Sequence, residues 1–171
     1  MSVTIRAATP KDARAIAEVH VSSWHWAYRD DLPASALEGR SLEDRELMWT
    51  EWFASQEPAS DVLVAEVDGR IVGFSGFGMS RDDAATEGTG EIRTIYLLQD
   101  AAGKGIGRDL FACANARLRD LGYQRATLWI LETNERSRRF YEKAGWTWDG
   151  TTSTHQFDCA NLPIVRYATD L

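Results

Sequence analysis

Apolar residues recur with a helical period in the first third of the chain and mostly with a two-residue period after it. Residues 3–6 alternate as a first strand. Residues 9–12, with Thr at the N-cap and Pro at the first helical position, predict a helix whose apolar stripe consists of Ile16, Val19, His20 and Trp24. Pro33 bounds an irregular stretch. A second cap at residues 41–44 predicts a helix with an apolar side made of Leu42, Met48, Trp49, Trp52 and Phe53.

Alternating segments dominate after residue 61. Residues 62–67 and 70–74 flank Asp68-Gly69, which predicts a β-hairpin, and residues 91–97 predict a further strand. The remaining expected elements are a helix from Ile106 to Leu121 before Gly122, a buried strand at 126–131, a helix at 136–144 before Gly145, and strands at 146–151 and 164–168. The order β-αα-βββ-α-β-α-ββ predicts one mixed α+β domain over residues 1–171.

Composition narrows the function classes. The chain has 171 residues, of which 44% are hydrophobic, and a formal net charge of −7, so nucleic acid is not an expected partner. No apolar run reaches the roughly 18 residues of a membrane span, and residues 1–6 lack a signal peptide's hydrophobic stretch, so we expect a cytoplasmic protein that does not bind membranes. Two cysteines, Cys113 and Cys159, are too few for a disulfide framework.

A glycine-rich turn at residues 102–108 stands between a predicted strand and a predicted helix. Glycines let successive backbone N–H groups point into one concavity, and the helix N-terminus adds partial positive charge. The turn is therefore a candidate anion cradle, with a plain turn that binds nothing as the alternative. Its spacing differs from the Walker sequence and from the dinucleotide-binding fingerprint.

Two blocks of the sequence resemble the GNAT N-acetyltransferase superfamily, in the form of a small bacterial-type single-domain member. Residues 102–107 are similar to its [QR]-x-x-G-x-[GA] signature, since Gly105 and Gly107 match, although Ala102 stands where the family has Arg or Gln. Residues 134–146 are similar to its N-x-x-[AS]-x-x-[FL]-Y-x-K-x-G-[FW] helix. The resemblance covers residues 60–170 with these motifs and the two N-terminal helices by their order.

The resemblance implies a GNAT fold, a mixed central sheet flanked by helices whose fourth and fifth strands splay apart around acetyl-CoA, with no metal. The residues implied to contact acetyl-CoA are Ile95, Tyr96, Leu97, Gly103, Lys104, Gly105, Ile106, Gly107, Arg108, Asn134, Ser137 and Tyr141. Three further arginines are either a solvated helix face, which we favour, or additional phosphate contacts: Arg136, Arg138 and Arg139. The histidines lack the i,i+4 spacing of a metal site.

The resemblance also suggests the two catalytic residues. Tyr141 is the candidate acid for the leaving thiolate, because a phenol carries its proton at neutral pH; packing beside Phe140 is the alternative. Glu91 is the candidate base that takes the amine proton, with a strand-end carboxylate, or a water as base, as the alternatives.

The acceptor is expected to be a primary amine on a small cationic molecule such as a polyamine or an amino sugar. The candidate acceptor residues are Trp24, Trp26 and Tyr28, and acidic residues that favour a cation lie at Asp30, Asp31, Asp82, Asp83 and Glu87. A protein or peptide amine, a non-catalytic acyl-CoA sensor and a nucleotide-binding module stay open. Exposed aromatic residues and the C-terminal strand permit a homodimer.

Overall fold

The computed structural model describes residues 1–38, 41–55, 57, 60–157 and 160–171, so Cys159 lies outside the described residues. The strands are β1 (Val3–Ala7), β2 (Asp61–Val67), β3 (Arg70–Met79), β4 (Thr89–Leu97), β5 (Arg125–Leu131), β6 (Thr147–Phe157) and β7 (Ala160–Asp170). The helices are α1 (Ala13–Tyr28), α2 (Ala34–Leu37), α3 (Leu42–Ser55), α4 (Ile106–Asp120) and α5 (Glu135–Lys143), with single 3-10 turns η1 (Pro10–Asp12) and η2 (Gln99–Ala101). None of the described helices is long and apolar enough to cross a membrane.

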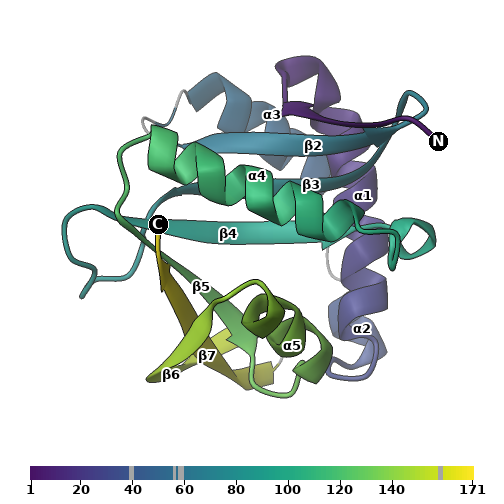
Figure 1. The fold of residues 1–171 in the computed structure, drawn as a ribbon. Helices are drawn as coiled ribbons and strands as arrows, with labels where there is room; N and C mark the ends of the chain where they lie inside the picture. The colour runs from purple at the N-terminus through teal and green to yellow at the C-terminus, as the bar shows by residue number, and fades with distance from the viewer. Residues whose placement is uncertain (39–40, 56, 58–59, 158–159) are drawn as a thin grey trace.

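The described strands form one seven-stranded sheet in the order β1-β2-β3-β4-β5-β7-β6. Among these strands only β4 and β5 pair in parallel, and in the described part of the chain they pair only where Thr89–Glu91 meets Arg125–Thr127. Beyond that point the two strands diverge (Figure 1). At Arg93 the register between β3 and β4 shifts by one residue, a bulge of the kind often found beside active sites. The mixed α+β fold with splayed fourth and fifth strands is confirmed.

Helices cover both faces of the sheet. In Figure 1, α4 lies across the near face of β2 to β4, while α1 and α3 lie behind them. The apolar stripe of α1 and the Trp49 side of α3 pack together against Val62, Val64 and Phe74. On the other face, α4 packs Leu110, Phe111 and Leu118 onto the sheet in a cluster that also contains Trp146 and Tyr167. The predicted apolar faces are therefore the buried ones.

Local signals in the sequence explain the element ends. Asp12 Oδ2 accepts the Thr9 backbone N–H (2.8 Å), and the Ser41 hydroxyl accepts the Asp44 backbone N–H (3.1 Å), as the two capping patterns predict. The β2–β3 turn has positive φ at Asp68 (48°) and Gly69 (85°), which a two-residue I′ hairpin requires.

Several element bounds differ from the expectation, and β3 runs to Met79, beyond the predicted end at residue 74. Helix α2 is a single turn inside the stretch that was expected to be irregular, because four residues are too few to show a helical period. Strands β6 and β7 extend well beyond 146–151 and 164–168. The two strands pair with each other from Thr152 opposite Val165 to Phe157 opposite Ala160. Most residues beyond the predicted bounds are polar and exposed, so the sequence shows no buried face there.

Candidate active site

A cavity of about 860 Å³ opens where β4 and β5 diverge. Residues 92–97 of β4 and 128–130 of β5 form its walls, and the start of α4, the start of α5 and the end of α1 surround it. Among the described residues no strand pairs with this side of β4 after Glu91. A strand edge in that state offers backbone N–H and C=O groups to an amide-containing ligand. The Leu97 carbonyl already accepts the Ser23 hydroxyl (3.1 Å).

The glycine-rich turn forms one end of this cavity. Gly103 (φ 77°) and Gly105 (φ 82°) take the left-handed conformation, and Gly105 is the N-cap of α4. The positive end of a 15-residue helix and its unpaired N–H groups therefore face the cavity. Of the six turn residues implied to contact acetyl-CoA, the four on the cavity wall are Gly103, Gly105, Gly107 and Arg108. The side chain of Ile106 is buried in the core instead, and Lys104 is exposed.

Gly107 tests whether a ligand fits here. Its φ is not positive, and a Cβ built on it would meet only the Leu97 Cδ2 atom, at 3.8 Å. Neither backbone conformation nor packing therefore requires glycine at this position. Because Gly107 lines the cavity, the missing side chain keeps space open above the start of α4, as a bound diphosphate needs.

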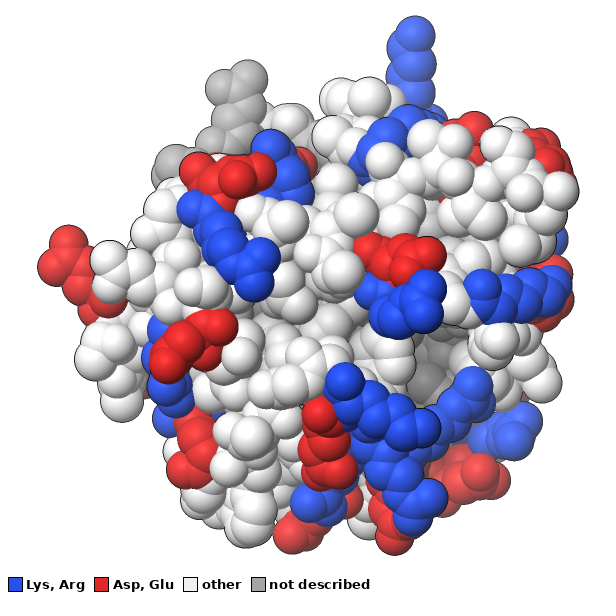
Figure 2. Space-filling model, in the orientation of Figure 1, with Lys and Arg blue, Asp and Glu red and all other residues white. Residues whose placement is uncertain are grey.

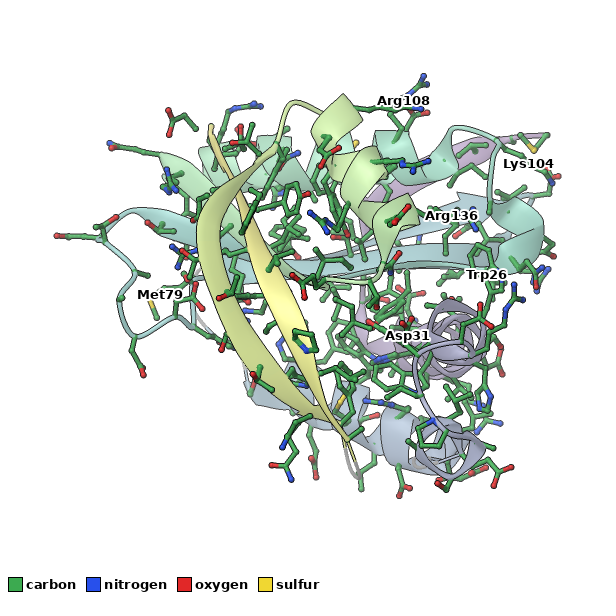
Figure 3. All side chains as sticks on the ribbon, turned by 90° about the horizontal axis from the view of Figure 1, so that it is seen from below. Trp26, Asp31, Met79, Lys104, Arg108 and Arg136 are labelled. Carbon is green, nitrogen blue, oxygen red and sulfur yellow. The ribbon has the colours of Figure 1, made fainter. Side chains whose placement is uncertain are left out.

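Basic side chains gather at the same cavity. Figure 2 shows Lys and Arg side chains beside a hollow between the start of α4 and α5. The Arg136 guanidinium lies over the Trp26 ring, 4.6 Å from its centroid, and Figure 3 shows both residues between α5 and α1. Arg139 pairs with exposed Glu135 (3.1 Å). Arg138 is half-buried, and its Nε donates to the Tyr167 hydroxyl (3.2 Å) and its Nη1 to the Glu132 carbonyl (2.9 Å).

Helix α5 brings three of the expected residues to the cavity: Asn134, Ser137 and Tyr141. The Asn134 side-chain oxygen accepts the Ser137 backbone N–H (3.1 Å) and caps the helix, which leaves its amide N–H groups as donors. Tyr141 is 6% exposed and packs against Phe111, with 5.4 Å between ring centroids. Burial, with a smaller effect of the Tyr28 hydroxyl, raises the pKa of the Tyr141 phenol, which therefore stays protonated at neutral pH.

Glu91 lies outside the residues that line this first cavity. Its Oε2 accepts the Arg81 backbone N–H (2.9 Å) and contacts the Ser80 hydroxyl (3.5 Å). Burial raises the pKa of the Glu91 carboxyl, the Arg81 N–H opposes that shift, and the charge of Asp82 adds to it. A carboxylate with a raised pKa is better suited to accept a proton near neutrality.

A second cavity of about 500 Å³ lies on the α1 side of β4. It shares Thr94 and Tyr96 with the first cavity, so the two meet at β4. Its walls come from α1, α2, α3, β4 and β6, and its described lining residues are His20, Val21, Trp24, His25, Ala36, Leu37, Arg45, Met48, Arg81, Thr94, Tyr96, His155, Gln156 and Phe157. Arg81 lines this cavity, and its backbone N–H donates to Glu91, which itself is not among the described lining residues.

The three candidate acceptor residues do not all line the same cavity. Trp24 lines the second cavity, whereas Trp26 and Tyr28 line the first. Tyr28 packs on Trp24, with 4.4 Å between ring centroids, and its hydroxyl forms a hydrogen bond with that of Tyr96. These rings therefore form the partition between the two cavities, together with Phe157 from β6.

The acidic residues named from the sequence do not line the second cavity. Asp30 and Asp31 lie at the first cavity, where Asp31 accepts the Thr133 hydroxyl (2.7 Å). Asp82 pairs with Arg166 (3.1 Å) and accepts the Trp129 indole N–H. The second cavity instead has arginines that the sequence analysis missed, because Arg45 and Arg81 come from distant segments with no motif.

Comparison with known protein families identifies the family of this chain. A family model described as Acetyltransferase (GNAT) family matches residues 20–146. The chain belongs to the GNAT acetyltransferase family. This GNAT acetyltransferase is 33% identical to the uncharacterized N-acetyltransferase YuaI of Bacillus subtilis over 134 residues, which cover 77% of this chain and 73% of that protein.

Solved structures share the whole GNAT fold. The PaiA N-acetyltransferase of Thermoplasma acidophilum, in complex with coenzyme A, superposes with a TM-score of 0.79 at 20% identity and full coverage of both chains. YncA of Salmonella typhimurium, with its cofactor acetyl-CoA, superposes with a TM-score of 0.76 at 22% identity, over 99% of this chain and 94% of that one. Both likenesses confirm the fold of the acetyltransferase.

Proposed function

We propose that this enzyme transfers the acetyl group of acetyl-CoA to the primary amine of a small molecule. The observation that carries the proposal is the meeting of two cavities at β4, one with a helix N-terminus suited to a diphosphate and one with an aromatic wall. Family membership supports the reaction, and the ligands of PaiA and YncA support the donor.

The donor would lie in the first cavity. Backbone groups of residues 95–97 would pair with its amides, the turn at residues 103–108 would hold its diphosphate, and Asn134 would donate to it. Ala102 lines the cavity without any polar side-chain atom. Arg136, held over Trp26 at the same cavity, is suited to supply the charge that Arg or Gln gives elsewhere in the family.

Bound acetyl-CoA supplies a thioester carbonyl that an amine can attack. Glu91, directly or through an ordered water, takes the proton that the amine nitrogen loses as it forms the new C–N bond. Tyr141 gives its phenolic proton to the sulfur as the C–S bond breaks, and it regains a proton from solvent. Tyr141 lines the first cavity and Glu91 is hydrogen bonded to Arg81 of the second, so in this proposal acid and base would act from different sides of the reacting carbonyl.

A small amine fits the second cavity better than a protein substrate does. Its volume of about 500 Å³ is within the range of small-molecule sites, and residues from five elements enclose it. The sequence suggested a polyamine or an amino sugar, but the described lining supplies no carboxylate for a second ammonium group. We therefore propose a small molecule with one primary amine. The cytoplasmic location and the homodimer stay predictions.

Calorimetry and a thiol-release assay test this function together. We expect acetyl-CoA and CoA to bind while ATP and NAD do not, and we expect CoA release to depend on an added amine. Binding of acetyl-CoA without release by any amine would identify a sensor instead of an enzyme. Binding of ATP or NAD in place of CoA would overturn the donor.

A further inference from the structure

The second cavity has two arginines on its described wall. They are Arg45 from α3 and Arg81 from the β3–β4 loop. Among its described lining residues there is no Asp or Glu. This local charge runs against the chain as a whole, whose formal net charge is −7. Within a cavity the nearby groups matter more than distant surface charge, which salt screens.

Arg81 is only partly compensated by two neighbouring carboxylates, Glu57 and Glu91, of which Glu91 also accepts its backbone N–H. The Arg81 Nη2 lies 3.7 Å from Glu57 Oε2, but the same oxygen accepts Arg93 Nη1 (3.1 Å) and the Trp52 indole N–H (3.3 Å). One carboxylate is therefore shared by two guanidinium groups. The Arg81 side chain is 62% exposed, so its guanidinium is accessible to a ligand.

Arg45 is positioned by its surroundings. Its guanidinium lies 5.8 Å from the centroid of the Trp24 ring, and its Nη1 contacts the Met48 sulfur at 3.8 Å. Burial raises the pKa of the Tyr96 phenol and the positive charge of Arg45 opposes that shift, so the charge acts on the residue where the two cavities meet. Arg45 is thus near both the aromatic wall and the expected reaction centre.

We propose that the acceptor carries an anionic group, a carboxylate or a phosphorus oxyacid, close to its primary amine, and that Arg45 and Arg81 bind that group in the second cavity. The inference rests on the proposed function and names its substrate class, which is a small zwitterion of the amino-acid type. Guanidinium groups bind carboxylates and oxyacids through paired N–H donors. The amine would then face Thr94 and Tyr96, where the first cavity begins.

The same charges would discriminate against other amines. A polyamine would bring its second ammonium group toward two guanidinium groups, and such like-charge contacts are unfavourable. A monoamine without an acidic group would lose the arginine contacts but would keep the aromatic wall of Trp24 and Phe157. The expected order of preference is therefore amino acid, then monoamine, then polyamine.

A matched substrate series tests the inference. L-leucine, L-leucinamide and 3-methylbutylamine share one side chain, but only the first has a carboxylate, and spermidine serves as the polyamine. We expect CoA release with kcat/KM at least tenfold higher for leucine than for the other three. Arg45→Gln and Arg81→Gln should each raise the KM for leucine at least fivefold and reduce the ratio of kcat/KM for leucine to that for 3-methylbutylamine, and Arg81→Lys should restore part of the loss.

Arg70→Gln is the control, because Arg70 pairs with exposed Asp100 (3.2 Å) and lines neither cavity. Calorimetry with CoA checks that each variant is folded and keeps its donor site. If 3-methylbutylamine or spermidine is acetylated as well as leucine, or if both arginine variants keep the parental preference, the inference is wrong and the proposed function stands. If none of the four probes releases CoA, the inference is overturned, and the proposed function falls only if no other primary amine releases CoA either.

Discussion

The Tyr141 ring packs against Phe111 and Phe140, and the same residue lines the first cavity. We predict that Tyr141→Phe lowers kcat by about 10²-fold and changes acetyl-CoA affinity by no more than a few fold, since the ring packs and only the hydroxyl supplies a proton. Tyr123→Phe, at a tyrosine that lines neither cavity, should keep parental kinetics. A parental rate in Tyr141→Phe, with chemistry limiting, would make Tyr141 a packing residue.

The raised pKa of Glu91 gives a pH signature. Only the ionised carboxylate accepts a proton, so parental kcat/KM should fall as pH decreases through a pKa above the usual glutamate range. The Glu91→Gln variant has no carboxylate to accept the proton, so its rate depends on the fraction of amine that is already deprotonated. The parent should therefore exceed the variant most between the pKa of Glu91 and that of the amine, and the two profiles should approach each other at high pH. Superimposable pH–rate profiles would make Glu91 structural.

Gly107 separates ligand binding from folding. Gly107→Val should weaken acetyl-CoA binding more than tenfold, because the side chain occupies cavity space that only the Leu97 tip approaches. Thermal stability should change little for the same reason. Ala112→Val, on an exposed position of the same helix, controls for valine in α4. Calorimetry and thermal melts measure both quantities, and unchanged affinity in folded Gly107→Val would refute the cradle.

Among the helices, the start of α1 is stabilised by an ion pair between Arg6 and its N-cap residue, Asp12. The Arg6 guanidinium, helped by Thr9 and opposed by burial, holds the pKa of Asp12 at about 2. This lowered pKa stabilises the fold above the ordinary aspartate pKa, and the contribution is lost as pH falls toward 2. Asp12→Asn should cost about 1–2 kcal/mol at pH 7 in urea unfolding, allowing for solvent around Arg6, and less at pH 3.

The control for that comparison is Asp100→Asn, whose partner Arg70 lies on the surface with it, and we expect no measurable loss. A difference between parent and Asp12→Asn that is the same at pH 7 and pH 3 would contradict the charge-based account of this helix start.

The helices with a clear apolar period and the strands with local turn signals were predictable, because caps, glycines and periodicity act over a few residues. The glycine turn and the α5 motif also indicated the donor site. The divergence of β4 from β5 was expected only through the family resemblance, since pairing between distant strands leaves no local pattern. The separation of Trp24 from Trp26 has a simple cause: residues two apart on a helix point about 200° apart, so they face different cavities.

The second cavity is a property of the whole molecule. Arg45 and Arg81 are 36 positions apart in the sequence and meet only because α3 and the β3–β4 loop flank the same side of β4, so no motif predicted their charge. Contacts between distant segments also cross the mouth of the first cavity. Trp26 of α1 meets Arg136 of α5, and Asp31 after α1 accepts the hydroxyl of Thr133 before α5.

All described strands belong to one sheet, which favours the prediction of a single domain over residues 1–171 that unfolds as one unit. We expect one cooperative thermal transition that acetyl-CoA shifts upward, since a ligand at 100 times its Kd stabilises by about 2.7 kcal/mol. Calorimetric and van't Hoff enthalpies should agree. Two separate transitions, only one of them sensitive to acetyl-CoA, would contradict a single domain.

The most direct test is a single-turnover transfer experiment. The enzyme is loaded with acetyl-CoA labelled in the acetyl group and mixed with L-leucine, and the product is identified by mass spectrometry. The account predicts N-acetyl-leucine in amounts that match the CoA released, and a rate about 10²-fold lower in Tyr141→Phe. Bound acetyl-CoA that persists with every amine tested, or label that appears only as free acetate, would contradict it.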